Sequence, residues 1–133
     1  KGFAGSLKEA FKKYIGHLAP AYVAKKQKKL PELVKIIRDC GGIPVIAHPG
    51  LQGLDKELQA LKDSGIEGVE VFHPDHASAL TQKLLEESER LSLLITGGSD
   101  YHGSAKENLP LGIIRLPCRY AVKLKEAHRA RVH

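Results

Sequence analysis

Two kinds of hydrophobic pattern alternate along the 133-residue chain. In the first, apolar residues recur every three or four positions, which is typical of an amphipathic helix. Ser6 can cap such a helix at its start, Pro31 suits a first helical turn, and Gly41-Gly42 can end a helix. The pattern predicts an irregular, basic segment over residues 16–30 and helices over residues 5–15, 31–40, 54–64, 77–91 and 119–130.

The second pattern is a short, continuous apolar run, which is typical of a strand that is buried on both faces. Such runs lie between the predicted helices and occupy residues 43–47, 66–72, 93–96 and 111–116. Strands that alternate with helices favour a mainly parallel sheet covered by helices, either in a barrel or in an open α/β sheet. The expected fold class is therefore α/β.

Polar residues follow three of these strands directly. His48 comes after the first strand, His73 and His76 after the second, and Asp100 and His102 after the third. Parallel strands end at the same edge of a sheet, and this edge is where α/β folds bind ligands. We therefore expect these side chains to lie along one edge of the sheet.

Asp100 and His102 stand two residues apart in a glycine-rich segment. In an extended segment, residues i and i+2 point the same way, so a carboxylate and an imidazole can converge on one ion. The flanking glycines allow a tight path or a positive φ. This pair of groups suits Zn²⁺, Mn²⁺ or Fe²⁺. The alternative is a loop in which Asp100 caps a turn and His102 is exposed.

The other polar residues at this edge are open to more than one interpretation. Pro49 disfavours the helical conformation for the residue before it, so we expect an extended His48 with a fixed aim. The alternative for His48 is a hydrogen-bonded structural histidine. Glu70, His73 and His76 are candidates for contacts to a substrate or for support of metal ligands, and a solvated turn would explain them equally well.

Composition narrows the class of protein. No apolar run approaches the roughly 18 residues that a membrane span needs. Two cysteines, Cys40 and Cys118, are too few for a disulfide scaffold, so we expect reduced thiols in a cytoplasmic protein. The chain has no P-loop, no dinucleotide-binding glycine motif, no nucleophile elbow and no HExxH motif. Tryptophan is absent and aromatic residues are 5%, which disfavours base stacking on aromatic platforms.

Charge is distributed unevenly. Residues 1–38 hold ten Lys and Arg against two Asp and Glu, residues 39–114 hold five against twelve, and residues 115–133 hold six against one. The basic ends are either solvated helix faces or a rim that attracts an anion such as a phosphate ester. The densest basic cluster, Lys25–Lys29, also leaves open an RNA-binding module.

Three segments taken together resemble a known family. They are GGIPVIAHPG (residues 41–50), GVEVFHPDHASALTQKLLEES (68–88) and TGGSDYHG (96–103). They are similar to the later part of the PHP domain, the polymerase-and-histidinol-phosphatase family of metal-dependent phosphoesterases. The segment FKKYIGHLAPAYV (11–23) resembles the branch of nucleoside 3′,5′-bisphosphate phosphatases and 5′-to-3′ exoribonucleases.

The resemblance implies that residues 1–133 are the C-terminal portion of a distorted (β/α)7 PHP barrel, with metals bound at the carboxyl ends of the strands. His48, Asp100 and His102 fall on positions that are metal ligands in the family, for Mn, Zn, Fe or Mg ions. The family's HxHxxxSD element, which supplies further ligands, has no counterpart in this sequence.

From this resemblance we expect hydrolysis of a phosphomonoester of a nucleotide or short oligonucleotide by metal-activated water. Three ligands cannot hold a multinuclear centre, so we expect little activity from these residues alone. The missing N-terminal half of the barrel, or a second copy of the chain, is the expected partner for the open sheet. No membrane partner is expected. The alternative function is that of a non-catalytic PHP remnant that serves as a binding or scaffold module.

Overall fold

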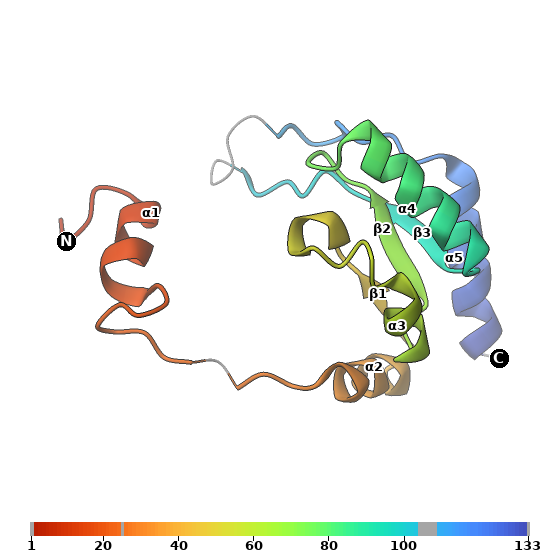
Figure 1. The fold of residues 1–133 in the computed structure, drawn as a ribbon, viewed down its shortest axis with the longest axis horizontal. Helices are drawn as coiled ribbons and strands as arrows, with labels where there is room; N and C mark the ends of the chain where they lie inside the picture. Colours follow the sequence, from red (N-terminus) through yellow and green to blue (C-terminus); the bar gives the residue numbers. More distant parts are fainter. Residues whose placement is uncertain (1, 25, 104–108, 133) are drawn as a thin grey trace.

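A computed structural model describes residues 2–24, 26–103 and 109–132 (Figure 1). Its centre is a parallel three-stranded sheet in the order β1-β2-β3. The strands are β1 (Val45–Ile46), β2 (Gly68–Phe72) and β3 (Leu94–Gly97), which match three of the predicted strands. Because both strand pairs are parallel, all three strands end at the same edge of the sheet.

The prediction of a fourth strand over residues 111–116 is wrong, because this stretch forms a turn followed by irregular chain. Pro110 and Pro117 flank it, and Gly112 has a φ of 83°. Proline has no N–H for a strand ladder, and a left-handed glycine turns the chain out of the extended conformation. The mainly parallel α/β class with covering helices is confirmed by the other three strands.

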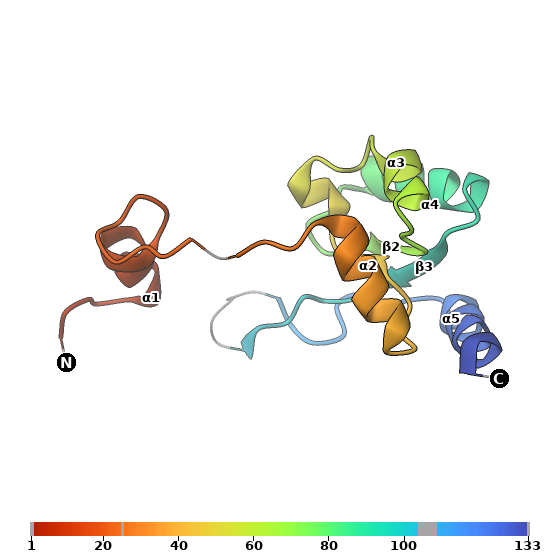
Figure 2. The same ribbon diagram turned by 90° about the horizontal axis from the view of Figure 1, so that it is seen from below.

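Two helices, α3 (Leu58–Asp63) and α4 (Ser78–Arg90), lie together on one side of the sheet, and Figure 2 shows them opposite α5. Val69 and Val71 of β2 are fully buried in a core that includes Leu58 of α3 and Leu84 of α4. Helix α4 matches its prediction closely. Helix α3 is shorter than predicted, because residues 54–57 form turns before it. This core fixes the sheet edge from which the site loops leave.

Helix α5 (Cys118–Val132) lies beside β3. Near its start, the buried ring of Tyr120 lies 5.8 Å from the ring of Phe72, measured between centroids. Near its end, Arg131 donates a 2.6 Å hydrogen bond to the carbonyl of Gly42 and forms an ion pair with Glu67. Arg38 holds the other carboxylate oxygen of Glu67 at 2.8 Å, so α2, β2 and α5 are joined at the amino end of the sheet.

Helix α2 (Leu30–Asp39) has Pro31 in its first turn, and Gly41 follows it with a φ of 75°. Val34 is the buried residue of this helix. Three other apolar side chains on α2 are between 37% and 43% exposed, namely Leu33, Ile36 and Ile37. An apolar face of α2 is therefore uncovered within the part of the chain that the structure describes.

The N-terminal segment stands apart from the sheet in both ribbon views. The hydroxyl of Ser6 accepts the N–H of Glu9, so the predicted helix cap is confirmed. The predicted helix changes its pitch midway, from the α-helical α1 (Leu7–Ala10) to the π-helical η1 (Phe11–Ile15). The N–H of Gly16 bonds to the carbonyl of Phe11, and the described residues from 16 to 29 are irregular, as predicted.

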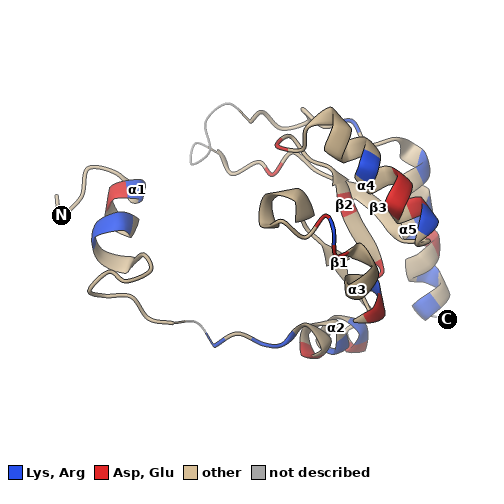
Figure 3. Ribbon diagram, in the orientation of Figure 1, with Lys and Arg blue, Asp and Glu red and all other residues tan. Residues whose placement is uncertain are grey.

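Figure 3 shows Lys and Arg along the segment before α2 and on α5. Lys25, the first residue of the predicted basic cluster, lies outside the described residues. Cys40 and Cys118 are free and exposed. None of the helices in the described ranges is both long enough and apolar enough to cross a bilayer.

Candidate functional site

The candidate site residues from the sequence lie in the loops that follow the three strands, except Glu70, which lies within β2. We call these six residues, His48, Glu70, His73, His76, Asp100 and His102, the rim cluster. The ring centroids of His48 and His73 are 5.5 Å apart, and those of His73 and His76 are 5.3 Å apart. His73 Nε2 lies 3.8 Å from Asp100 Oδ2. His73 therefore connects the loops that follow all three strands.

His48 begins the turn after β1, and its conformation differs from the prediction. We expected an extended residue before Pro49, but His48 is left-handed, with φ 32° and ψ 57°. The chain must enter the short 3₁₀ helix η2 (Pro49–Gln52) at once, and the backbone N–H of His48 donates a 2.8 Å hydrogen bond to Glu70 Oε2. The carboxylate of Glu70 thus fixes this turn, since a left-handed residue with a Cβ costs energy that the surroundings must supply.

Sequence reasoning missed Gln52, whose Nε2 lies 3.1 Å from His48 Nδ1. Its position four residues after His48, across a single turn, was the available signal. A carboxamide can donate through its nitrogen or accept through its oxygen, so Gln52 can support either tautomer of the imidazole. Gln52 therefore orients the His48 ring without fixing which nitrogen carries the proton.

His73 is the most buried residue of the rim cluster, with 2% of its surface exposed. Its Nδ1 accepts the backbone N–H of Asp75 at 3.1 Å. An imidazole nitrogen that accepts a hydrogen bond carries no proton, so the proton of neutral His73 is on Nε2. That Nε2 is buried and has no hydrogen-bond partner among the described residues.

His76 has the opposite tautomer. Its Nδ1 lies 2.9 Å from the carbonyl of Val71, which can only accept a hydrogen bond, so Nδ1 is the donor. Its Nε2 carries a lone pair and is buried without a hydrogen-bond partner within the described ranges. A Cβ at Gly50 would lie 3.0 Å from this nitrogen and 2.5 Å from a methyl carbon of Leu80. Glycine at position 50 therefore lets the first loop pack against His76.

Asp100 and His102 come close to each other, although the segment is not extended as we expected. Asp100 is left-handed, with a φ of 49°. His102 Nδ1 lies 2.6 Å from the carbonyl of Asp100 and 3.7 Å from its carboxylate Oδ1. The short separation is therefore produced by the left-handed backbone at Asp100, and the His102 side chain is exposed. The predicted positive φ among the flanking glycines occurs at Gly103, whose φ is 62°.

The donor groups of the rim cluster are of the kind that binds a divalent cation. A carbonyl only accepts, so His102 uses Nδ1–H toward the Asp100 carbonyl and keeps a lone pair on its exposed side at Nε2. Metal-binding histidines are commonly oriented in this way, with the second nitrogen donating to a carbonyl or carboxylate. The Asp100 carboxylate supplies oxygen ligands beside it.

The cluster nevertheless falls short of a complete metal site. Over residues 2–24, 26–103 and 109–132, no three His, Cys, Asp or Glu side chains are placed to hold one metal ion. His48, Asp100 and His102 share the sheet edge, and His73 lies against both His48 and Asp100. The arrangement offers suitable donors without closing a coordination shell.

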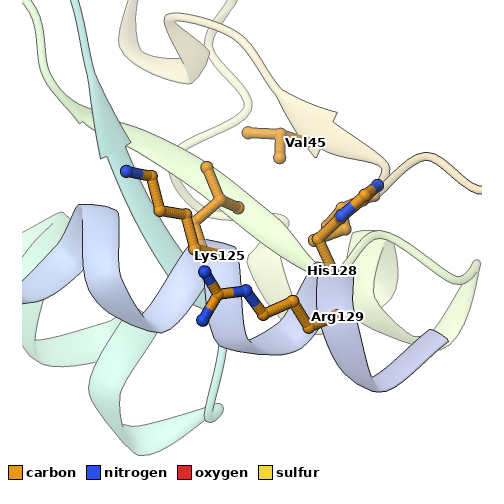
Figure 4. Close-up of a pocket in the computed structure, with 6 residues that line it drawn as sticks. Val45, Lys125, His128 and Arg129 are labelled. Carbon is orange, nitrogen blue, oxygen red and sulfur yellow. The ribbon is translucent and has the colours of Figure 1, made fainter. Parts of the chain in front are cut away.

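One cavity adjoins the rim cluster and another lies away from it. The first, of about 500 Å³, is bordered by His73 and His76 and has apolar walls that include Leu85, Ile113 and Ile114. The second, of about 420 Å³, lies between α5 and the start of β1 and contains no rim-cluster residue (Figure 4). Its walls are Ile43, Val45, Leu124, Lys125, His128 and Arg129. The first cavity is therefore the better placed to receive a substrate of the rim cluster.

The resolved pKa shifts belong to contacts away from these loops. A hydrogen bond from Lys83 lowers the pKa of Asp55, and one from Arg90 lowers the pKa of Glu87. The same Glu87 contact raises the pKa of Arg90. A hydrogen bond with Tyr120 raises the pKa of Arg119. These contacts lie on α4, on α5 and in the turn before α3.

Curated proteins similar to this chain are phosphoesterases by name. A phosphoribosyl 1,2-cyclic phosphate 1,2-diphosphodiesterase of Eggerthella lenta is 42% identical over 72 residues, which cover 54% of this chain and 28% of that protein. A 3′,5′-nucleoside bisphosphate phosphatase of Chromobacterium violaceum is 28% identical over 116 residues, which cover 84% of this chain and 41% of that protein. A 5′-3′ exoribonuclease of Haemophilus influenzae is 29% identical over 99 residues, which cover 71% of this chain and 36% of that protein. The chain thus spans less than half the length of each relative.

Solved structures agree with the fold. A crystal structure assigned as a metal-dependent phosphoesterase of Bifidobacterium adolescentis superposes with a TM-score of 0.69 and 28% identity, covering 88% of this chain and 43% of that one. An amidohydrolase of Chromobacterium violaceum, with bound sulfate and no metal, superposes with a TM-score of 0.66, 24% identity, and coverage of 98% and 46%. The second supports the fold alone. No protein-family model matches the sequence. Together the relatives confirm the predicted resemblance and the partial α/β barrel.

Proposed function

We propose, from this resemblance to PHP phosphoesterases, that the chain supplies one side of a metal-dependent centre that hydrolyses phosphate esters. The observation that carries the proposal is the rim cluster, in which histidines and carboxylates from three strand ends meet at one edge of a parallel sheet. One relative is named a nucleoside bisphosphate phosphatase, which supports a phosphomonoester of a nucleotide as the substrate. Another is named an exoribonuclease, which supports a short oligonucleotide.

The proposed ligands of a divalent Mn, Zn, Fe or Mg ion are His48, Asp100 and His102. Such an ion, when bound, activates water and neutralises charge on the phosphoryl oxygens. The residues of the chain have separate tasks around it. Glu70 holds the His48 turn through the backbone N–H, and Gln52 orients the His48 ring. The cavity beside His73 and His76 would receive the rest of the substrate.

We further propose that the 133 residues alone bind the ion weakly and hydrolyse little substrate. The described residues contain no three-ligand set, and the sequence lacks the HxHxxxSD element. Full activity would then need the remaining half of the barrel. Metal binding without any hydrolysis, even after that half is supplied, would instead favour the non-catalytic binding module.

The test replaces Asp100 by Ala in a protein that joins this chain to an N-terminal PHP segment. Loss of a direct ligand is expected to reduce Mn²⁺-dependent hydrolysis of a nucleoside 3′,5′-bisphosphate by more than the roughly 10–100-fold that losing an outer partner costs. Asp63→Asn is the matched control, because Asp63 lies exposed on α3 beside Gln59. Unchanged turnover of the Asp100→Ala protein with bound Mn²⁺ would refute the proposal.

A further inference from the structure

His73 differs from the other histidines of the rim cluster in what its two ring nitrogens can do. Its side chain has no exposed surface, and it lies against Asp100 on one side and the backbone of Asp75 on the other. A buried imidazole with two directed neighbours is held in one orientation. The tautomer of the ring decides whether this orientation presents a lone pair or a proton to the Asp100 carboxylate.

The hydrogen bond from the backbone N–H of Asp75 determines the tautomer of His73. A backbone N–H can only donate, so His73 Nδ1 must accept and is unprotonated. The ring proton is then on Nε2, which faces Asp100 Oδ2 at 3.8 Å. His73 Nε2 therefore cannot offer a lone pair to a cation unless the contact with Asp75 is broken. This separates His73 from His102 and His76, whose Nδ1 atoms donate to carbonyls.

Because His73 is buried, its Nε2–H needs a hydrogen-bond acceptor within the protein. A buried N–H without a partner is destabilising, and His73 Nε2 has no hydrogen-bond partner within the described residues. A shift of roughly 1 Å would bring it into the 2.7–3.2 Å range of an N–H···O bond with Asp100. Asp100 Oδ1 would stay on the side of His102, where it lies 3.7 Å from Nδ1.

We propose that His73 is a positioning residue that donates its Nε2–H to Asp100 Oδ2 and turns the other carboxylate oxygen toward the cation site. The role rests on the proposed metal-dependent function, but the contact itself exists without metal. Asp100 is left-handed, a conformation that costs energy, so a donor that holds its side chain also helps to hold its backbone. His73 acts through Asp100 and does not bind the ion.

The first experiment is long-range ¹H–¹⁵N NMR on the whole ¹⁵N-labelled chain without metal. We expect His73 to show the Nε2-protonated tautomer and His102 the Nδ1-protonated tautomer. Asp100→Asn should shift the His73 Nε2–H signal, whereas Asp63→Asn should not. An Nδ1-protonated His73, or a His73 Nε2–H signal that stays unchanged in Asp100→Asn, would overturn the inference. Neither result would contradict the proposed function.

The second experiment titrates Zn²⁺ alone. When Zn²⁺ binds, the ¹⁵N signal of His102 Nε2 should move away from its metal-free position, while His73 keeps its Nε2 proton. His73→Gln places an amide N–H near the original Nε2 and should keep the Zn²⁺ affinity within a few-fold, whereas His73→Ala should lower it about tenfold or more. Direct Zn²⁺ coordination by His73, or equal loss in both variants with intact fold, would overturn the inference. Failure of the chain to bind Zn²⁺ even when it is joined to an N-terminal PHP segment, while the His73 contact persists, would refute the proposed function and leave the contact standing.

Discussion

Gly50 sits where any side chain would collide with the rim cluster. A Cβ there would lie 2.5 Å from Leu80 Cδ2 and 2.9 Å from His76 Cδ2. Because both neighbours are held by packing around α4, Gly50→Ala is expected to lower the free energy of unfolding by roughly 1–3 kcal/mol, as overpacking does. Urea denaturation followed by circular dichroism measures this change.

Gly98→Ala is the matched control for Gly50→Ala. A Cβ at Gly98 would meet only Glu70 Oε1, at 3.4 Å, which is an ordinary contact with a flexible side chain. Its unfolding free energy should stay within about 1 kcal/mol of the wild type. Equal losses in the two variants would show that the first loop can move away from His76.

At the residue scale, the sequence predicted that the three proposed metal ligands share one edge of the sheet, but it did not predict their conformation. His48, Asp100 and His102 stand after apolar strands, and parallel strand ends must share an edge, so their neighbourhood was predictable. The left-handed backbone of His48 and Asp100 was not. Local rules place a residue before proline in the extended region. At His48 the backbone N–H donates a hydrogen bond to a carboxylate 22 residues away, and this contact overrides the rule. No short-range pattern contains this information.

Among the elements, α4 is tied to the turn before α3 by an ion pair. Lys83 Nζ lies 2.9 Å from Asp55 Oδ2. This hydrogen bond, with a smaller Coulombic contribution, lowers the pKa of Asp55 below its ordinary value of 3.8. A group whose pKa is lower in the folded state adds stability above its unfolded pKa and loses it as pH falls through the folded value.

Asp55→Asn should therefore lower the melting temperature slightly at pH 7, where the wild-type carboxylate is charged. The difference should shrink as the pH falls through the lowered pKa of Asp55 and disappear once the wild-type carboxyl is protonated as well. Melting curves of the two proteins from pH 2 to pH 8 test this. A difference that grows as the pH falls would contradict the assigned pair, and Asp63→Asn controls for the loss of a surface charge.

Element prediction succeeded where hydrophobic periodicity and end signals agreed. Pro31 and Gly41 mark the two ends of α2, and the buried runs around Val69 and Ile95 became β2 and β3. Residues 111–116 are an apolar run that pairs with none of the described strands. The left-handed Gly112 turns the chain there, so no strand forms. The pitch change from α1 to η1 depends on the Gly16–Phe11 hydrogen bond, which apolar spacing alone does not indicate.

At the scale of the whole molecule, the sheet is open on the side of β1. Strand β1 pairs with β2 alone among the described strands, and its neighbour α2 exposes Leu33, Ile36 and Ile37. An unpaired strand edge beside an apolar helix face favours association. We propose that the rest of a barrel, or a second copy of the chain, covers this side. The chain's match to less than half of each solved relative supports this proposal.

Ile36→Lys tests the contact, because it places a charge in the centre of the apolar face of α2. The wild-type chain should elute as a dimer or larger species at micromolar concentration, and Ile36→Lys should shift the mass measured by light scattering toward the monomer. Val122→Lys is the matched control, since Val122 is an exposed apolar residue on α5. A monomeric wild type, or dissociation by Val122→Lys alone, would contradict self-association through α2. A monomer that binds a separately purified N-terminal PHP half, and loses that binding on Ile36→Lys, would assign the same face to the completion of one barrel.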